Sequence, residues 1–530
     1  MTNAEKFFEK IKDKKVAFIG IGVSHTDVIR QFAEKGIYTE ARDKTDREKL
    51  GETADLLEKS GAVLKLGEGY LDDMDADIVF RTPGMNWWNP ALCEFRREGK
   101  AVTSEMEVFF DLCPCKKYAV TGSDGKTTTT TLISEFLAAE GKTVHTGGNI
   151  GRALLPIIEE IKDEDCAVVE LSSFQLISMR TSPDVAVVTN VAPNHLDVHK
   201  DMEEYIEAKR NVLRHQNAFS VAVLNADNVI TKSMAELVRG ELRWFSHLNP
   251  VHNGSFLRED GMLCYSDHGK ITELFHRSEI KIPGLHNVEN YLTAIAATWG
   301  EVSVETMEKV AKNFGGVEHR IELCREFEGV RWYNDSIATS PTRTIAGLSC
   351  FDQKIILLAG GYDKNIPYAP LAPSLIEKVK ILILCGATAP KIAEALQNHP
   401  DYDGSPEMIF VEDMEEAVST AYAYAEEGDI VALSPASASF DRYKNFELRG
   451  KHFKELVSKI GQVDGLSAEE LWPLYSALIL HTGENLWIPK KCSANFVPLT
   501  ETPATKNLPQ KPRWNFFPNT EKPISITLEA

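Results

Sequence analysis

The chain has 530 residues, 43% of them hydrophobic and 26% charged, which is the composition of an ordinary globular protein too long for one hydrophobic core. Its formal net charge of −20 opposes nonspecific binding to nucleic acid or to an anionic membrane, although a local basic pocket for phosphates is compatible with it. No apolar run reaches the roughly 20 residues that cross a bilayer. Residues 1–15 lack the apolar stretch of a secretory signal, and the nine cysteines show no paired zinc spacing. We therefore expect a cytoplasmic protein of about three domains.

Short β-rich runs alternate with helical patterns along most of the chain, which predicts α/β domains with mainly parallel sheets. In such sheets ligands collect at the carboxyl ends of the strands. A helix is expected from about Lys126, and a third segment is expected to start near Val330. The predicted strands are 15–20, 37–42 and 77–81, then 118–121, 166–171 and 185–190, then 355–359, 381–385 and 430–434.

The texture of the sequence changes after about Gly461. An apolar, tryptophan-rich stretch, 471–488, is followed by a series of prolines without repeat or sustained periodicity. These residues predict a disordered or loosely attached tail.

A glycine-containing loop follows the strand 118–121, in the order Gly122-Ser123-Asp124-Gly125-Lys126-Thr127-Thr128. Glycines let backbone N–H groups point inward, a helix N-terminus adds a positive dipole, and lysine and threonine side chains can hold phosphate and Mg²⁺. The alternative is a tight strand-to-helix turn with a solvated lysine, since Val120 stands where a standard phosphate loop has glycine. The N-terminal Gly20-Ile-Gly22 lacks a third glycine and is interpreted as a turn near a nucleotide.

Three further side chains follow predicted strands or lie on the next helix. Glu170 closes an apolar strand, where a buried carboxylate needs a partner such as Mg²⁺. His195 lies in the loop after the strand 185–190, and Lys209 lies on the helix that follows. Singly, His195 could be a capped or surface residue and Lys209 a solvated helix lysine.

The order of these motifs resembles the central domain of the Mur ligases, a superfamily that includes the folylpolyglutamate synthases. The motifs are Gly-Ser-Asp-Gly-Lys-Thr, Glu-Leu-Ser-Ser-Phe-Gln, Asn-His-Leu-Asp-x-His and Glu-Ala-Lys. The resemblance implies that Lys126 holds the β- and γ-phosphates of ATP and that Thr127 and Glu170 bind one Mg²⁺. It also implies that His195 and Lys209 serve a second Mg²⁺, with Lys209 as its carbamate. A neutral lysine amine and CO₂ yield an anion suited to a hard cation.

Later motifs extend the resemblance over about residues 14–458. It implies that ATP or the incoming amino acid is held by Asn290, Arg320, Asp335 and Thr339, although such residues also cap loops. The pattern near the C-terminus is most similar to the D-glutamate-adding member, which implies amino-acid contacts from Lys364, Ser439 and Phe446. The muramoyl nucleotide is expected to meet Asn149 and Gly84, and Asp43 is a further candidate.

The resemblance also implies a domain organisation and an activity. Residues 1–113 form a Rossmann-like uridine-nucleotide domain, 114–317 the central ATP and Mg²⁺ domain, and 318–460 a Rossmann-like amino-acid and ATP domain, with 461–530 as the tail. The implied activity is ATP-dependent amide formation between UDP-N-acetylmuramoyl-L-alanine and D-glutamate through an acyl phosphate, in peptidoglycan precursor synthesis. A monomer is expected.

Two residues depart from the family pattern. Asp124 stands where asparagine is common, and Ile337 replaces a lysine found in many relatives. Three alternatives stay open: another Mur ligase, a folylpolyglutamate synthase-like enzyme, and an ATP-binding regulatory protein that has lost ligation. A P-loop motor or signalling NTPase is less favoured, because the motifs of His195 and Lys209 have no role there.

Overall fold

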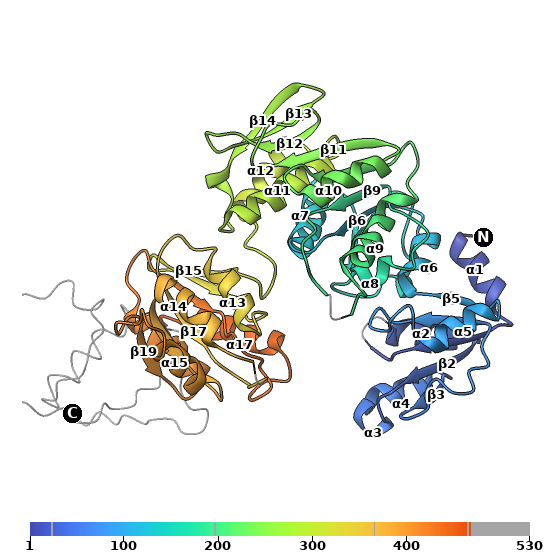
Figure 1. Ribbon diagram of the computed structural model, residues 1–530, viewed down its shortest axis with the longest axis horizontal. Helices are drawn as coiled ribbons and strands as arrows, with labels where there is room; N and C mark the ends of the chain where they lie inside the picture. The colour runs from blue at the N-terminus through green and yellow to red at the C-terminus, as the bar shows by residue number, and fades with distance from the viewer. Residues whose placement is uncertain (23–24, 196–197, 365, 464–465, 468–530) are drawn as a thin grey trace, which may run out of the picture. The chain divides into compact units, whose positions relative to one another are not determined.

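The computed structural model describes residues 1–22, 25–195, 198–364, 366–463 and 466–467 (Figure 1). It divides into two compact units, Met1–Phe314 and Gly315–Ala530. The first unit contains two large sheets and the second contains one, and most neighbouring strands in all three run parallel. The predicted α/β class with mainly parallel sheets is confirmed. The positions of the domain boundaries at 113/114 and 317/318 stay predictions.

The N-terminal sheet has the strand order β3-β2-β1-β4-β5, and all its strands are parallel. The chain moves from β1 toward β3 and then returns to the other side of β1, so the order reverses between β1 and β4. Loops at the carboxyl ends of two such strands diverge and leave a crevice for ligands. The strands are β1 Lys15–Ile19, β2 Tyr38–Asp43, β3 Val63–Leu66, β4 Ile78–Arg81 and β5 Ala101–Thr103, and the helices are α1 Asn3–Ile11, α2 Thr26–Glu34, α3 Arg47–Leu50, α4 Glu52–Lys59, α5 Pro90–Arg97 and α6 Glu105–Leu112.

The central sheet has the order β14-β13-β12-β11-β10-β9-β6-β8-β7, in which only the pairs β12–β13 and β13–β14 are antiparallel. Its strand β6 lies between β8 and β9, so the loops after all three strands meet at one edge. The strands are β6 Lys116–Thr121, β7 Val144–Gly148, β8 Cys166–Glu170, β9 Val185–Val188, β10 Val221–Asn225, β11 Glu241–Ser246, β12 Gly254–Leu257, β13 Met262–Asp267 and β14 Lys270–His276. The helices are α7 Lys126–Ala139, α8 Ser173–Leu176, α9 Met202–Arg214, α10 Val229–Ser233, α11 Leu285–Thr298 and α12 Val304–Asn313.

The two faces of β6 pack against different helices because successive side chains of a strand point to opposite faces. Tyr118 and Val120 join the buried cluster that contains residues of α7 and α11. Ala119 belongs to the cluster that contains Val212 of α9. Thr121, two residues after Ala119, therefore points to the face that α9 covers.

The sheet of the second unit has the order β15-β16-β20-β17-β18-β19, with β15 antiparallel at its edge. It begins at Glu322, earlier than the expected start near Val330, because β15 is only partly buried and lacks a continuous apolar run. The strands are β15 Glu322–Phe327, β16 Val330–Asn334, β17 Ile355–Ala359, β18 Val379–Leu384, β19 Glu407–Phe410 and β20 Ile430–Leu433, and the helices are α13 Pro341–Leu348, α14 Ala372–Lys378, α15 Ala389–Gln397, α16 Met414–Tyr424 and α17 Phe446–Lys459.

The nine strands predicted from apolar runs are all present, with ends that shift by one or two residues. Of the predicted tail, the structure describes only residues up to 467, apart from 464–465. Here β21 Gln462–Val463 pairs antiparallel with β22 Leu466–Ser467. Residues 468–530, on which the prediction of a loose tail depends, lie outside the described residues. In the part of the chain that is described, no helix has both the length and the apolar character needed to span a bilayer.

Candidate active site

The predicted phosphate loop lies between β6 and α7, at the edge where β6, β8 and β9 end. Gly125 has φ +75° and is the N-cap of α7. A Cβ atom built there would lie 2.5 Å from Oδ1 of Asn290, so only glycine fits without displacement. Asn290 is itself fixed, since it accepts from the Thr129 hydroxyl at 3.2 Å and donates to Asn287 at 3.1 Å. The structure thus brings Asn290 of α11 to the phosphate loop.

Hydrogen bonds from the loop after β9 hold the phosphate loop in shape. The Ser123 hydroxyl donates to the carbonyl of Ala192 at 2.9 Å and lies 3.0 Å from the Tyr205 hydroxyl. The backbone N–H of Asp124 donates to Oδ1 of Asn190 at 3.0 Å. A loop pre-formed in this way needs little reorganisation to bind a ligand.

The Lys126 ammonium lies over the loop and donates to the carbonyls of Gly122 and Ser123 at 3.1 and 2.9 Å. It thus combines with the N-terminus of the 14-residue helix α7 to form a positive region. This region lies at the carboxyl end of β6, where a parallel sheet binds its ligands.

Thr127 and Glu170, the predicted ligands of one Mg²⁺, are in direct contact. The Thr127 hydroxyl donates to Oε2 of Glu170 at 2.8 Å. The side-chain amide of Asn149 donates to Oε1 of the same carboxylate at 2.7 Å. Glu170 is buried, so these hydrogen bonds offset the cost of removing its charge from water. The hard oxygen atoms fit Mg²⁺, which usually binds one or two protein oxygens together with substrate phosphates.

Lys209 lies beneath the phosphate loop on the side of α9. Its ammonium nitrogen donates to the Gly122 carbonyl at 2.8 Å and to the Thr121 hydroxyl at 3.3 Å. The side chain is only 1% exposed. Burial, followed by the nearby positive charge of Lys126, holds the pKa of Lys209 well below its usual value, against the opposite pull of Asp124 and Glu170. Both effects favour the neutral amine over the ammonium form.

The ring of Tyr205 connects Lys209 with His195. The Lys209 nitrogen lies 4.6 Å from the centre of this ring. The His195 imidazole centre lies 6.4 Å from it and 5.2 Å from the ring of Phe174. His195 is exposed and has φ +55°, a backbone conformation that is uncommon for residues other than glycine. Within the described residues, no three or more His, Cys, Asp and Glu side chains gather closely enough to hold a metal on their own.

The N-terminal residues predicted to meet the nucleotide lie at the edge where β1, β2 and β4 end. The Asp43 carboxylate accepts the N–H of Ile21 at 2.6 Å and that of Thr45 at 2.8 Å, so it fixes the turn after β1. Gly84 is exposed in the turn after β4. Gly20, with φ +93°, packs against Thr82, since an added Cβ would lie 2.7 Å from its methyl group. Gly20 and Thr82, which directly follow β1 and β4, therefore pack against each other at this edge.

In the second unit, Asp335 directly follows β16 and is 4% exposed. Burial raises the pKa of Asp335 to about 7, and the Ser434 hydroxyl, which donates to it at 2.7 Å, lowers it in part. The charges of Arg320 and Arg343 also act on this carboxylate. Thr339 lies in the same turn and is partly buried, while Arg320 is exposed. The predicted ATP contacts Asp335, Arg320 and Thr339 thus gather at one sheet edge.

The predicted amino-acid contacts come from the loops after β17 and β20, neighbouring strands at which the chain order reverses. Ser439 is buried, Phe446 is partly buried at the start of α17, and Lys364 is exposed. The Phe446 carbonyl accepts the Ser336 hydroxyl at 2.8 Å, which ties α17 to the turn after β16. The common role of Lys364, Ser439 and Phe446 in binding the amino acid stays a prediction.

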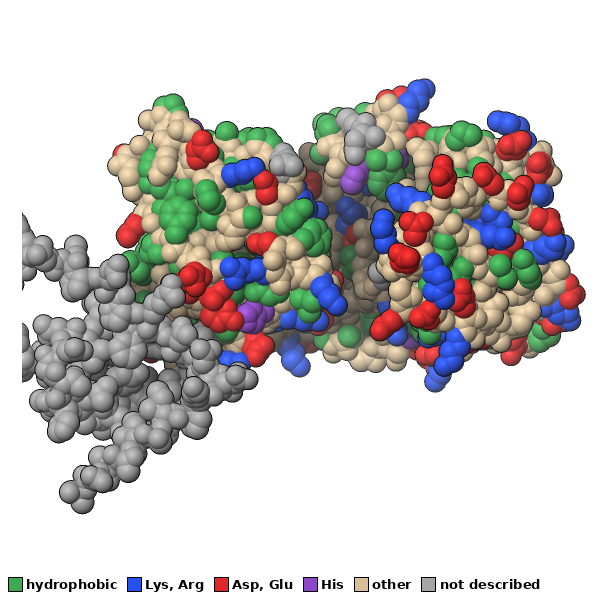
Figure 2. All heavy atoms as spheres, turned by 90° about the horizontal axis from the view of Figure 1, so that it is seen from below, with side chains coloured by type: hydrophobic (Ala, Val, Ile, Leu, Met, Phe, Trp, Pro, Cys, Tyr) green, Lys and Arg blue, Asp and Glu red, His purple; other side chains and the backbone are tan. Residues whose placement is uncertain are grey.

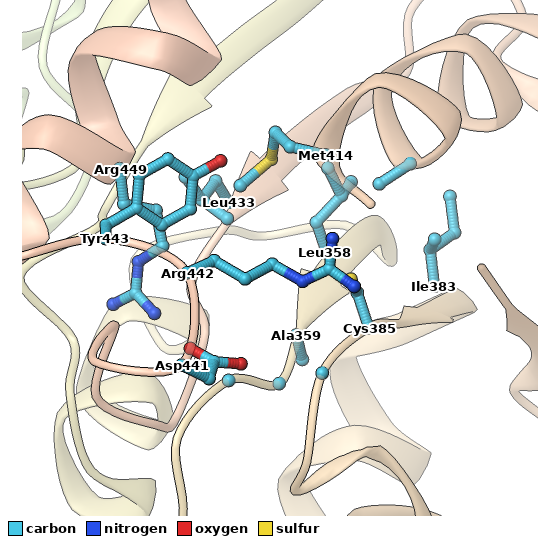
Figure 3. Close-up of a pocket in the computed structure, with 14 residues that line it drawn as sticks. Leu358, Ala359, Ile383, Cys385, Met414, Leu433, Asp441, Arg442, Tyr443 and Arg449 are labelled. Carbon is cyan, nitrogen blue, oxygen red and sulfur yellow. The ribbon is translucent and has the colours of Figure 1, made fainter. Parts of the chain in front are cut away.

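A pocket at the ends of β17, β18 and β20 adjoins these loops (Figure 3). Arg442 extends across it toward Cys385, and Asp441 lies beside the glycine turn after β17. Arg449, which also lines the pocket, is 3% exposed and donates to the carbonyls of Ser336, Ser437 and Ala438 at 2.9–3.0 Å. Burial lowers the pKa of Arg449 to about 10. This arginine of α17 joins the turn after β16 to the loop after β20.

The residues that support the site were not among the predicted site residues. Tyr205 has a sequence signal, because its spacing of four from Lys209 places both on one face of α9. Ser434 directly follows β20 and Asn190 comes two residues after β9, which is a second signal. Arg449 has none, since it acts through carbonyls distant in sequence.

Charges of both signs are mixed on the face of the molecule that Figure 2 draws. Figure 2 shows acidic and basic side chains interspersed on the face drawn, without one continuous acidic area. The net charge of −20 is therefore compatible with local binding of anionic ligands.

Solved structures of low sequence identity share this fold. The UDP-N-acetylmuramate-alanine ligase of Thermotoga maritima matches with a TM-score of 0.53 at 19% identity, over 84% of this chain and all of that one. A UDP-N-acetylmuramoyl-L-alanyl-D-glutamate–2,6-diaminopimelate ligase matches with a TM-score of 0.51 at 17% identity, over 85% and 94% of the two chains.

Sequence comparison is more specific. Residues 120–298 match the Mur ligase middle domain, and residues 319–437 match the Mur ligase glutamate ligase domain. The UDP-N-acetylmuramoylalanine–D-glutamate ligase of Acetivibrio thermocellus is 53% identical over 463 residues, which cover 87% of this chain and 99% of the relative. The enzyme of the same name from Clostridium perfringens is 48% identical over 457 residues, 86% and 99% of the two chains. The chain therefore belongs to the Mur ligase family, within the group of its D-glutamate ligases.

Proposed function

We propose that the protein uses ATP to form an amide bond between the carboxylate of UDP-N-acetylmuramoyl-L-alanine and the amine of D-glutamate, in peptidoglycan precursor synthesis. One observation carries the proposal. A phosphate loop bound by Lys126, with Thr127 hydrogen-bonded to Glu170, occurs in a chain 53% identical to a ligase of this name. We further propose that it acts as a monomer in the cytoplasm.

A carboxylate is a poor electrophile and must be activated before an amine can attack it. In the proposed reaction, an oxygen of the alanyl carboxylate attacks the γ-phosphorus of ATP, the bond to the β-phosphate oxygen breaks, and ADP leaves. The D-glutamate amine, deprotonated, then attacks the carbonyl carbon of the acyl phosphate. The bond from carbon to the phosphate oxygen breaks, and inorganic phosphate leaves with its electron pair.

The residues of the central domain have distinct roles in this scheme. Gly122, Ser123, Asp124, Gly125 and Thr128 form the loop that surrounds the phosphates, and Lys126 neutralises the β- and γ-oxygens. Thr127 and Glu170 would hold one Mg²⁺, and His195 with carbamylated Lys209 a second. Bound Mg²⁺ supplies positive charge that offsets charge developing on the transferred phosphoryl group. Asn290 supports the loop through Gly125.

Three sets of residues are proposed to hold the other ligands. Asp335, Arg320 and Thr339 bind ATP from the second unit. Lys364, Ser439 and the backbone at Phe446 bind the glutamate carboxylates, since a cation and N–H donors suit a dicarboxylate. Asn149, Gly84 and Asp43 contact the muramoyl nucleotide.

The first test measures phosphate release by the purified protein with ATP, Mg²⁺ and UDP-N-acetylmuramoyl-L-alanine, with D-glutamate and then L-glutamate. Release that requires both acceptor and amino acid, and that prefers the D isomer, is expected. Activity on folate instead would identify a folylpolyglutamate synthase-like enzyme. ATP binding without release under any condition would favour a regulatory protein.

The Lys126→Ala variant tests the phosphate loop itself. We expect amide formation to fall by at least a thousandfold, because the transferred phosphate loses its main cation. Lys142→Ala is the matched control, since Lys142 is an exposed lysine just beyond the other end of α7. Retained activity in Lys126→Ala would remove the loop from the mechanism.

A further inference from the structure

Within the first unit, two side chains on either side of one turn of the N-terminal sheet reach the central sheet. The turn, residues 82–86, follows β4 and contains Gly84, a proposed contact of the muramoyl nucleotide. Arg81 directly precedes the turn. Trp88 follows it, and its backbone N–H donates to Oδ1 of Asn86 at 2.8 Å. Both side chains are therefore placed by the conformation of this turn.

Arg81 joins the turn to α8, the short helix after β8. Its buried guanidinium donates through Nη2 to the carbonyl of Phe174 at 2.6 Å and to the Ser178 hydroxyl at 2.9 Å. Nη1 donates to the carbonyl of Met85, within the turn, at 3.3 Å. A buried charge is costly unless hydrogen bonds satisfy it, so these bonds hold the turn and α8 in one arrangement.

Trp88 joins the same turn to the start of α9. Its indole N–H donates to Oε1 of Glu204 at 2.6 Å. The second oxygen of this carboxylate, Oε2, accepts the backbone N–H of Lys200 at 2.9 Å and lies 3.2 Å from Nδ1 of His199. An ionised carboxylate only accepts hydrogen bonds, so it binds Nδ1 as an N–H group. Glu204 thus receives hydrogen bonds from the nucleotide side and from the loop after β9.

His199 is buried and helps to fix His195, a proposed metal ligand. Its backbone N–H donates to the His195 carbonyl at 3.0 Å. Its ring stacks on the ring of Phe174, with the centres 5.0 Å apart and the planes 5° apart, and its Nε2 lies 2.9 Å from the Ser173 hydroxyl. The left-handed backbone of His195 is strained, and such a conformation persists only where the surroundings hold it. The position of His195 therefore depends on the contacts of His199.

We propose that Glu204 is a positioning residue that couples the muramoyl-nucleotide site to the Mg²⁺-ATP site. The inference rests on the proposed function. Whichever ligand binds first stabilises the hydrogen bonds from Trp88 through Glu204 to His199, so the second ligand meets a site that is already ordered. Arg81 supports the same arrangement, because it binds the backbone of Phe174, whose ring contacts both histidines.

Titration calorimetry on the full-length protein measures this coupling. A non-hydrolysable ATP analogue with Mg²⁺ is titrated with and without saturating UDP-N-acetylmuramoyl-L-alanine, and the ratio of the two Kd values is the coupling factor. We expect a factor of about 10 in the unchanged protein, and the same factor when the muramoyl nucleotide is titrated with and without the analogue. Glu204→Gln should reduce the factor to less than threefold, because an amide nitrogen replaces one of the two accepting oxygens.

Glu207→Gln is the matched control. Glu207 lies on the same helix, and its carboxylate accepts from Arg210 and Arg214, which also belong to α9. The same loss of charge should therefore leave the coupling factor unchanged. Trp88→Phe keeps an aromatic ring and removes the indole N–H. It should lower the coupling factor as Glu204→Gln does, while binding of the ATP analogue alone stays within twofold of the unchanged protein.

The outcomes separate the coupling from the proposed function. If the unchanged protein binds the ATP analogue and does not bind the muramoyl nucleotide, the proposed function fails, and the inference fails with it. If both ligands bind without affecting each other, or if Glu204→Gln and Glu207→Gln reduce the coupling factor equally, the role of Glu204 is overturned while the function stands. Steady-state kinetics give a second readout. Glu204→Gln should raise the KM for ATP and for the muramoyl nucleotide and keep kcat within threefold, whereas a loss of kcat with unchanged coupling would overturn the positioning role.

Discussion

The chemistry proposed for Lys209 depends on its surroundings more than on its residue type. A lysine at an exposed helix position is protonated at neutral pH and does not react with CO₂. Lys209 is buried between the phosphate loop and the Tyr205 ring, and its pKa is depressed mainly by that burial. Its two acceptors, Thr121 and Gly122, hold the amine in place. The structure therefore favours the neutral amine that carbamylation requires.

Carbamylation of Lys209 can be observed directly. Protein equilibrated with ¹³C-bicarbonate near neutral pH should show one carbamate resonance in ¹³C NMR, and acidification should remove it because protonated amines do not react with CO₂. Lys209→Arg should abolish the resonance. Lys312→Arg is the control: Lys312 pairs with Glu308 and Glu279, which raise its pKa, so it stays protonated and its loss should change nothing. A resonance that survives Lys209→Arg would contradict the assignment.

Residue identity alone predicted part of the site. Lys126 and Thr127 could be found because they follow the glycine-containing loop after β6, and Glu170 could be found because it is the last residue of the apolar strand β8. The edge of a parallel sheet brings such positions together. Other buried polar residues of the fold could not be found in this way. Glu105 is buried and accepts the N–H groups of Leu154 and Leu155 at 3.3 and 3.1 Å, and burial raises the pKa of Glu105 to about 7. No local pattern marks a contact between residues 50 positions apart.

At the scale of elements, continuous apolar runs predicted nine strands, all of which are present. The parallel strands β10 and β16 were missed although both are largely buried. Other missed strands have a different character. The edge strands β14 and β15 are only partly buried, so their sequences show no continuous apolar run. The strand order is likewise set by contacts between distant segments. The proximity of Asn290 on α11 to the phosphate loop follows from that order and from helix packing.

The junction between β6 and α7 depends on Gly125, which has no side chain that could contact a ligand. Gly125→Ala places a methyl group against Asn290 and forces a left-handed φ on alanine, which costs about 1–2 kcal/mol of stability from conformation alone. Loop displacement should also lower ATP affinity more than tenfold, measurable by calorimetry. Gly141→Ala is the matched control, because Gly141 has φ +94° at the end of α7 with nothing within 4 Å of an added Cβ. It should lose stability and keep ATP affinity; an equal loss of affinity in both variants would contradict the role of Asn290.

At the scale of the whole molecule, the residues proposed to bind ligands are divided between two compact units. The phosphate loop and Glu170 belong to Met1–Phe314, whereas Asp335, Ser439 and Phe446 belong to Gly315–Ala530. Each unit has its own buried clusters, which lie on both faces of its sheets. Separate cores imply separate unfolding, because cooperativity extends only as far as continuous packing.

Calorimetry should therefore resolve at least two unfolding transitions, and core substitutions should shift them one at a time. Leu132→Ala in α7 and Leu357→Ala in β17 form a matched pair, since both leucines are completely buried. Each removes about 2–5 kcal/mol from its own unit, which lowers one transition temperature and leaves the other unchanged. A single transition displaced by either substitution would mean that the two cores unfold together. Because residues proposed to bind ATP lie in both units, a non-hydrolysable ATP analogue should raise both transition temperatures in the unchanged protein.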